Sequence, residues 1–261
     1  MELGERYFKG SPETQNCVDL FKGEWSSRFP RRFGIESGGD AGLFEDERLE
    51  WALARLRERG RDLADARVLE LGPLEAGHTT MLEKSGARSI TAIEANGRAY
   101  MKCLIVKEIM QLRRTLFLLG DAVAELERSD ESYDVGVVSG FLYHMEEPVR
   151  LLHLLSKSCR HLYIWTHYYD SGFVKKHPEH RVRFDPPTYR LHEGFRHTVY
   201  PYRYEEALNW QGFCGGPKSR CNWLSRDDIL SALNYFGYSN VQVREEPNCH
   251  GRSMSIIASQ N

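Results

Sequence analysis

The sequence predicts an α/β fold in which helices flank a sheet of five parallel strands that continues into a C-terminal antiparallel pair. Three observations support this expectation. Five short apolar segments alternate with stretches of helical periodicity up to residue 166. Two segments with alternating apolar and polar residues, 240–246 and 253–259, then form an expected hairpin joined by PNCHGR. The 261 residues, 41% of them hydrophobic, suffice for one large domain with a sizeable insertion.

The individual elements follow from local signals. Residues 1–44 carry aromatic and turn residues without periodicity, so we expect an irregular N-terminal cap before a domain of residues 45–261. In this cap, Trp25 is expected to anchor the segment to the core, with a place in a pocket wall as the alternative. Asn96 and Ser225 can cap the helices that follow them. Strands are expected over residues 68–71, 89–95, 115–119, 134–138, 160–166, 240–246 and 253–259, and helices over 46–59, 96–114, 146–157 and 225–236.

The segment 67–81, RVLELGPLEAGHTTM, organises the fold. A short buried strand carries Glu70 at its carboxyl end, a Gly-Pro pair forces a turn, and a helix is expected from Thr79. Such an arrangement presents backbone N–H groups and a helix N-terminus to a ligand. The fingerprint G-x-G-x-x-G is not met, because Leu74 and Ala76 stand where glycines would be expected. A purely structural first strand is the alternative interpretation of this segment alone.

Polar side chains end the first four expected strands: Glu70, Glu94, Asp121 and Ser139. The carboxyl ends of parallel strands form the crevice in which open α/β sheets bind ligands, so we expect these side chains to converge. Glu94 lies about twenty residues beyond the first loop, where a carboxylate can accept hydrogen bonds from a pair of ribose hydroxyls.

A long connection, residues 168–222, separates the fifth strand from the last helix and is expected to be an insertion or lid. Between residues 175 and 203 it carries seven Lys or Arg against three Asp or Glu, interleaved with aromatic residues and four histidines. This composition favours a lid that recognises an anionic or aromatic substrate. A solvated surface hairpin is the alternative.

The ordered motifs VLELG, AIEAN, GDA and YDVGVVSGFLYHM resemble those of the class I S-adenosylmethionine (SAM)-dependent methyltransferases. The likeness covers residues 67–166 and, with the C-terminal tail, most of the chain. Within that superfamily, LYHMEEP and a histidine after the first loop are similar to the wobble-uridine (tRNA carboxymethyl) methyltransferase-like group. The resemblance implies a Rossmann-like seven-stranded sheet, SAM as cofactor and S-adenosylhomocysteine as product.

The resemblance also implies which residues bind the cofactor. Glu70 and Gly72 would lie near the methionine moiety, Glu94 on the ribose, and Asp121 near the adenine. Leu74 and Ala76, in place of glycines, leave less space for the cofactor at the first loop. Gly77-His78 can restore that space one step later. The complete set of implied cofactor-binding residues is Glu70, Gly72, Pro73, His78, Glu94, Ala95, Asp121, Ala122, Ser139 and Gly140.

Two histidines are candidates for a general base. His144 follows the fourth strand, beside the expected methyl group, and histidine has a near-neutral reference pKa. A His144 that caps a turn or contacts the cofactor is the alternative. His167, with Asp170, follows the fifth strand and is the second candidate. No metal is expected, although His167, Asp170 and a lid histidine could together hold a divalent ion.

Composition narrows the class of partner and compartment. A net charge of −2 and a pI near 6.6 lack the basic excess of nucleic-acid binders. No run approaches the roughly 18 apolar residues of a membrane span, so no membrane contact is expected. None of the thirteen tyrosines has Lys four positions later, which argues against a short-chain dehydrogenase. Cysteines without a CxxC pair favour reduced thiols and a cytoplasmic location; they are Cys17, Cys103, Cys159, Cys214, Cys221 and Cys249.

Taken together, we expect O-methylation of a small polar or anionic acceptor, such as a sugar or a natural-product intermediate. A tRNA wobble-uridine-type modification enzyme and a non-catalytic SAM-binding protein are the alternatives. The sequence leaves open whether the donor is SAM or its carboxylated relative, and whether the chain forms a homodimer.

Overall fold

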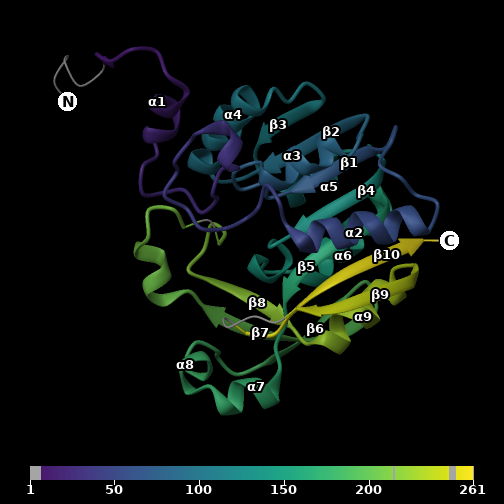
Figure 1. Cartoon of the computed structure of the whole chain (residues 1–261). Coiled ribbons are helices and arrows are strands. Elements are labelled where there is room, and N and C mark those ends of the chain that lie inside the picture. Colours follow the sequence, from purple (N-terminus) through teal and green to yellow (C-terminus); the bar gives the residue numbers. More distant parts are fainter. Residues whose placement is uncertain (1–6, 214, 247–250, 261) are drawn as a thin grey trace.

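A seven-stranded sheet forms the centre of the protein in a computed structural model that describes residues 7–213, 215–246 and 251–260 (Figure 1). The strand order is β3-β2-β1-β4-β5-β10-β9. The first five strands are parallel, and β10 is antiparallel to both β5 and β9. The expected fold class is therefore confirmed. The strands are β1 Arg67–Leu71, β2 Ser89–Glu94, β3 Thr115–Leu119, β4 Tyr133–Ser139, β5 Cys159–His167, β9 Tyr238–Glu246 and β10 Ser253–Gln260.

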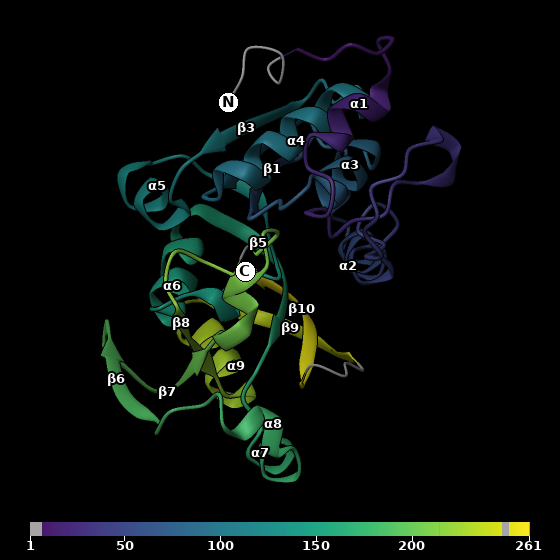
Figure 2. The same ribbon diagram turned by 90° about the vertical axis from the view of Figure 1, so that its left-hand side faces the viewer.

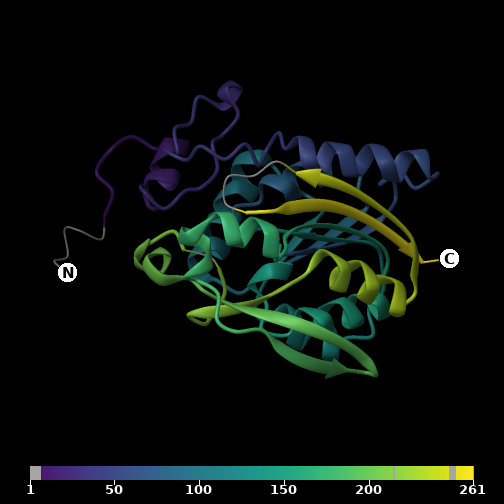
Figure 3. The same ribbon diagram turned by 90° about the horizontal axis from the view of Figure 1, so that it is seen from below.

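Helices cover both faces of the sheet. One face packs against α2 (Glu47–Glu58), α3 (Gly77–Lys84) and α4 (Gly97–Met110). The other packs against α5 (Ala122–Arg128), α6 (Pro148–Ser158) and α9 (Arg226–Tyr235). Figure 3 shows α2 and α9 on opposite sides of the sheet. Alternate residues of β4 enter the two apolar cores, as the two-residue period of a strand requires.

The helices α4 and α9 begin at the side chains that the sequence indicates. Asn96 accepts from two backbone N–H groups at the start of α4, and Ser225 accepts from Asp228 N–H at the start of α9. The expected end of α4 at residue 114 is wrong. Gln111 adopts a left-handed conformation (φ 57°), and Glu83 accepts from the next backbone N–H groups, so the chain leaves the helix early.

The residues expected to form the insertion contain a second, three-stranded antiparallel sheet of order β6-β7-β8. It joins the main domain where Asn222 N–H donates to the Met145 carbonyl (2.9 Å), next to the short helix η3 (Leu142–His144). In Figures 1 and 2 it lies beyond the end of β5. The elements here are α7 Ser171–Lys176, α8 Pro178–Arg181, β6 Thr188–His192, β7 Phe195–Arg203, η4 Glu205–Asn209 and β8 Arg220–Leu224.

The N-terminal segment packs against α3 and α4 at the same edge of the sheet as the insertion (Figures 1 and 2). It contains α1 (Thr14–Asp19) and the single turn η2 (Arg31–Phe33). Trp25 is buried, contacts Phe29 edge to face and donates its indole N–H to the Val18 carbonyl (2.9 Å). Trp25 therefore anchors the segment to the core and is not part of the cavity wall described below.

Some expectations concern residues outside the described ranges, namely Cys214, Cys249 and most of the PNCHGR connection. The described cysteines, Cys17, Cys103, Cys159 and Cys221, carry free thiols. Within the described ranges, no helix has the length and apolar character needed to cross a membrane.

Candidate active site

A cavity of about 510 Å³ opens at the carboxyl ends of β1, β2, β3 and β4. All of the expected cofactor residues except Glu70 line it, and so does His144. The structure thus brings together three of the four polar groups that the sequence predicts to converge, Glu94, Asp121 and Ser139, while Glu70 stays outside the wall. The expected residues in the wall are Gly72, Pro73, His78, Glu94, Ala95, Asp121, Ala122, Ser139, Gly140 and His144.

The loop after β1 forms one wall through Gly72, Pro73 and Leu74. Gly72 has a positive φ of 64°, and a Cβ there would lie 2.7 Å from the Phe141 ring, so only glycine fits. Leu74 and Ala76 also have positive φ (56° and 58°) without being glycines. The loop therefore reaches the left-handed conformations of a glycine-rich turn with side chains that disfavour them.

Glu94, at the end of β2, is the most strongly constrained acid in the wall. Its Oε1 accepts from Asn96 N–H (2.8 Å) and its Oε2 accepts from Leu74 N–H (3.1 Å). Burial raises the pKa of the Glu94 carboxyl, and backbone N–H groups, those of Asn96 and Leu74 among them, act against that increase. A carboxylate has about four acceptor positions, so each oxygen retains one for a ligand. Two adjacent hydroxyls are the natural donors for such a pair.

Asp121 follows β3 and starts α5. Its Oδ1 accepts from Val123 N–H (2.8 Å) and Ala124 N–H (3.3 Å), while Ala122 and Val123 contribute apolar surface to the cavity. A fixed carboxylate beside an apolar patch suits a flat heteroaromatic ring that carries an amino group.

Glu70 is buried next to the loop after β1. It is not one of the described residues that line the cavity. It accepts from the Thr79 hydroxyl (2.6 Å), which ties the end of β1 to α3. Burial raises the pKa of the Glu70 carboxyl to about 7. Its expected contact with the methionine moiety stays a prediction.

Asp46, Arg48 and His78 form a charged cluster at the cavity, of which the sequence indicated only His78. Arg48 and His78 both line the wall and share Asp46, with His78 Nε2 at 2.8 Å and Arg48 Nε at 2.9 Å from its carboxylate oxygens. Hydrogen bonds from both partners hold the pKa of Asp46 well below its usual range, despite burial. The Arg48 guanidinium lies 4.3 Å from the Trp165 ring centroid. Since Arg48 bonds to Asp46 through Nε and Nη2, its Nη1 can donate to an anion.

His144 is held by a tyrosine of the insertion. Its Nδ1 lies 2.7 Å from the Tyr204 hydroxyl, and that hydroxyl donates to the Gly215 carbonyl. A tyrosine hydroxyl has one proton, so Nδ1 of His144 must be the donor in the first bond. Nε2 then carries the lone pair. Burial lowers the pKa of His144 to about 3, which keeps the ring neutral.

His167 lies outside the wall of this cavity within the described part of the chain. Its Nδ1 donates to the Arg252 carbonyl (3.2 Å), and its ring stacks on Trp223 at 5.2 Å and 13°. Asp170 caps α7 by accepting from Phe173 N–H (2.7 Å). No three His, Cys, Asp or Glu side chains of the described residues are grouped so that they could hold a metal ion.

Comparison with known proteins identifies the architecture. Protein-family models and curated protein sequences give no match to this chain. Among solved structures, the N-terminal domain of EvdMO1, studied in the presence of S-adenosylhomocysteine (SAH) and D-fucose, aligns over 95% of both chains with a TM-score of 0.69 and 20% identity. The alignment covers 46% of the complete EvdMO1 chain. Magnesium protoporphyrin IX methyltransferase (ChlM) from Synechocystis PCC 6803, with bound SAH, aligns over 95% of this chain and all of its own (TM-score 0.60, 14% identity).

The chain has the class I SAM-dependent methyltransferase fold. Similar structures extend to a Burkholderia thailandensis 1,6-didemethyltoxoflavin-N1-methyltransferase, which covers 85% of this chain and 80% of its own with a TM-score of 0.54 and 13% identity. In this methyltransferase fold, the cavity occupies the crevice at the carboxyl ends of the parallel strands, where such sheets bind ligands.

The insertion lines the cavity with residues other than those expected. The basic and aromatic stretch 175–203 does not reach the cavity; Tyr189 is 89% exposed, and Tyr202 stacks on Trp223. The insertion residues in the wall are instead Gly216, Pro217, Lys218 and Arg220. The expectation that the stretch 175–203 faces the acceptor is therefore wrong: Tyr202 packs on β8, Phe195 packs on α9, and Tyr189 points to solvent.

Proposed function

We propose that the chain is a SAM-dependent methyltransferase that methylates a hydroxyl group of a small polar acceptor. The observation that carries this proposal is Glu94, whose two oxygens are each oriented by one backbone N–H and each retain one acceptor position. That arrangement matches the two neighbouring hydroxyls of a ribose. Asp121 and Ala122 beside it would receive the adenine.

The cluster of Asp46, Arg48 and His78 suits the amino-acid part of SAM. Arg48 is oriented by Asp46 and by the Trp165 ring, so its guanidinium is fixed before a ligand arrives. We assign Arg48 Nη1 to the cofactor carboxylate and His78 to the same end. Ser139 and Gly140, at the end of β4, would lie below the sulfonium.

Bound SAM would supply an electrophilic methyl group to an acceptor oxygen that loses its proton. The chain must align the acceptor, exclude water and receive that proton. His144 supports the last role, since Tyr204 fixes the tautomer in which Nε2 is unprotonated. The low pKa keeps the His144 ring neutral, so Nε2 is unprotonated at neutral pH. His167, whose Nδ1 is engaged by a backbone carbonyl outside the wall, is the weaker candidate.

A sugar is the acceptor class that we favour. Lys218 and Arg220 give the wall donors for hydroxyls or for an anionic substituent. Tyr143 and Trp165 add rings against which a sugar can pack. D-fucose was present with SAH in the structure of the EvdMO1 N-terminal domain, which supports this choice. A tRNA acceptor lacks such support, because the stretch richest in positive charge lies away from the cavity.

The test is an incubation with methyl-labelled SAM and a panel of free sugars, nucleotide sugars and tRNA. We expect label in a base-stable methyl ether of a sugar, and a loss of about a hundred- to ten-thousand-fold in rate for His144→Ala with SAH affinity nearly unchanged. Label in tRNA alone would refute the small acceptor. SAH binding without turnover on any acceptor class would favour the non-catalytic alternative.

A further inference from the structure

The loop that forms the cofactor wall has an unusual backbone. Leu74 and Ala76 adopt left-handed conformations that glycine tolerates and that side chains with a Cβ disfavour. Such residues keep these conformations only when the surrounding structure holds them there. The residue between them, Glu75, has no exposed surface and faces away from the cavity wall.

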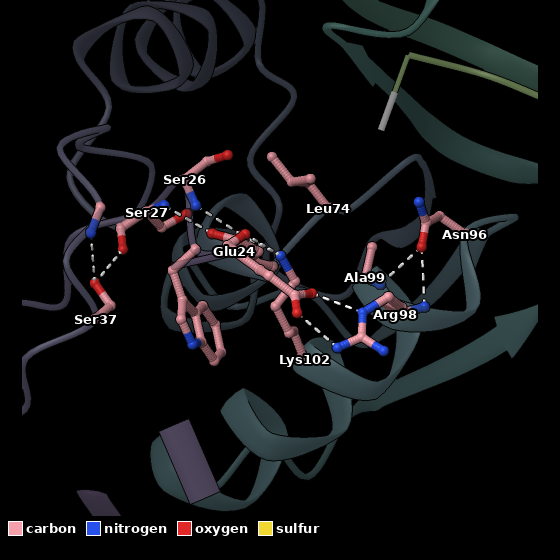
Figure 4. A network of polar contacts seen from close by, with 12 residues as sticks. Glu24, Ser26, Ser27, Ser37, Leu74, Asn96, Arg98, Ala99 and Lys102 are labelled. Atoms are coloured by element: carbon pink, nitrogen blue, oxygen red, sulfur yellow. Dashed lines mark hydrogen bonds and ion pairs between the residues drawn. The ribbon is translucent and has the colours of Figure 1, made fainter. Parts of the chain in front are cut away.

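Three donors hold the Glu75 carboxylate. Ser26 N–H (2.9 Å) and Lys102 Nζ (2.6 Å) donate to Oε1, and Ser27 N–H (2.7 Å) donates to Oε2. Two of the donors come from the N-terminal segment and the third comes from α4 (Figure 4). The carboxylate is therefore fixed by two parts of the chain that flank the loop in space but not in sequence.

Lys102 connects these parts. Its side chain is almost completely buried, and Nζ also donates to the Glu24 carbonyl (2.8 Å). The Glu24 carboxylate in turn accepts from Arg98, one turn earlier on α4 (2.6 and 2.7 Å), as Figure 4 shows. The ammonium of Lys102 thus links residues 24–27, the loop and α4. A buried lysine without such partners would be very costly.

The loop conformation matters for the cavity because Leu74 lines it and donates its N–H to Glu94. The N-terminal segment also touches the next residues directly. A Cβ at Gly77 would lie 2.6 Å from Leu43 Cβ, and Leu43 itself lines the cavity.

We propose that Glu75 is a positioning residue that replaces the missing loop glycines: Lys102 and the N-terminal segment hold it, and it holds Leu74 and Ala76 in the left-handed conformation that receives the cofactor. This inference rests on the proposed function for its ligand. It explains why the chain can do without glycine at these two positions. It also makes the N-terminal segment a part of the cofactor site, since cofactor binding and the packing of that segment then stabilise each other.

The first test disrupts the contacts of Glu75 with Lys102, Ser26 and Ser27, which we call the clamp. Lys102→Met should weaken SAH binding about tenfold or more in calorimetry, because Glu75 loses its charged partner and the loop loses its anchor. Lys107→Met is the matched control on the same helix: Lys107 donates to the Thr115 carbonyl (2.6 Å), remote from the loop, and this variant should bind SAH within about threefold of the wild type. If Lys102→Met does not fold, Glu75→Gln, which removes the charge with little change in shape, takes its place.

The second test separates positioning from a general loss of stability. Ala76→Gly removes the strain at one left-handed residue, so it should restore SAH affinity in the Lys102→Met background to within about threefold of the wild type, while changing the wild type little. Asp65→Gly is the control, since Asp65 is also left-handed (φ 64°) but lies before β1. It should raise stability without restoring affinity. Equal affinities for Lys102→Met and wild type, or no recovery with Ala76→Gly, would overturn the inference.

Failure of the proposed function would look different. If the wild type itself does not bind SAH, the cofactor assignment is lost, but the clamp can still be measured by hydrogen exchange. Amide exchange at residues 74–76 should be faster in Lys102→Met than in Lys107→Met, and slower again when Ala76→Gly is added. Unchanged exchange in all three variants would refute the clamp independently of any ligand.

Discussion

Glu94→Gln tests the cofactor assignment with the smallest change in shape. In the native structure, each Glu94 oxygen accepts one backbone N–H, from Leu74 or Asn96, and retains one acceptor position. An amide has one acceptor oxygen and one donor nitrogen. In either orientation, its NH2 group faces a backbone N–H, and one ribose hydroxyl loses its charged acceptor.

The loss of one hydrogen bond to a charged group corresponds to about 1.5–3 kcal/mol. We therefore expect the dissociation constant for SAH to increase about 10- to 150-fold. Isothermal titration calorimetry measures it, with Glu108→Gln on the exposed side of α4 as the control for a neutralised carboxylate. A folded Glu94→Gln protein that binds SAH within threefold of the wild type would refute the ribose assignment.

Three further predictions concern titration and catalysis. Since burial lowers the pKa of His144 to about 3, the base is unprotonated above that pH. The rate at saturating SAM should therefore not fall between pH 7 and pH 5. A fall in rate on the acid side with a midpoint near pH 6.5 would contradict this prediction. His167→Ala should retain turnover within about tenfold, whereas a loss as large as that of His144→Ala would reverse the order of the two candidates. The raised pKa of Glu70 means that the folded state binds its proton more tightly, so the folded state loses stability as pH rises from 4.5 through about 7. The shift in pKa corresponds to about 3 kcal/mol at most. Urea unfolding should therefore show that Glu70→Gln is more stable than the wild type at pH 8 but not at pH 5.

The order of strands and helices could be predicted because their signals are local. Apolar runs that end in a polar residue, and capping residues such as Asn96 and Ser225, lie within a few positions of the structure that they determine. The end of α4 was not predictable in this way. It depends on Glu83, some thirty residues earlier, accepting the backbone N–H groups of Arg113 and Arg114.

The cavity wall was largely predictable because parallel strands place their carboxyl ends together. Residues that reach the site from elsewhere were missed. Asp46 and Arg48 have the spacing of an ordinary helix start, and only the tertiary contact with His78 shows another role. Tyr204 lies sixty positions from His144, and nothing in its neighbourhood indicates that it fixes a tautomer. Lys102 lies in an apolar stretch of α4, where the sequence shows no sign of its buried carboxylate partner.

The insertion shows where composition misleads. Interleaved basic and aromatic residues favoured a substrate lid, yet rings such as Phe184 and Tyr202 pack with Trp223 into a small core of their own. A three-stranded sheet needs an apolar face, or a helix to pack against, for stability. The same residue types therefore served packing within the insertion, and the composition alone could not separate the two uses.

A crystal structure of the wild-type protein with SAH tests the central claim most directly. We expect SAH in the cavity at the ends of β1 to β4, with both ribose hydroxyls within hydrogen-bonding distance of Glu94, the adenine beside Asp121 and Ala122, and the carboxylate at Arg48. SAH bound elsewhere, or in this cavity with the ribose away from Glu94, would contradict it.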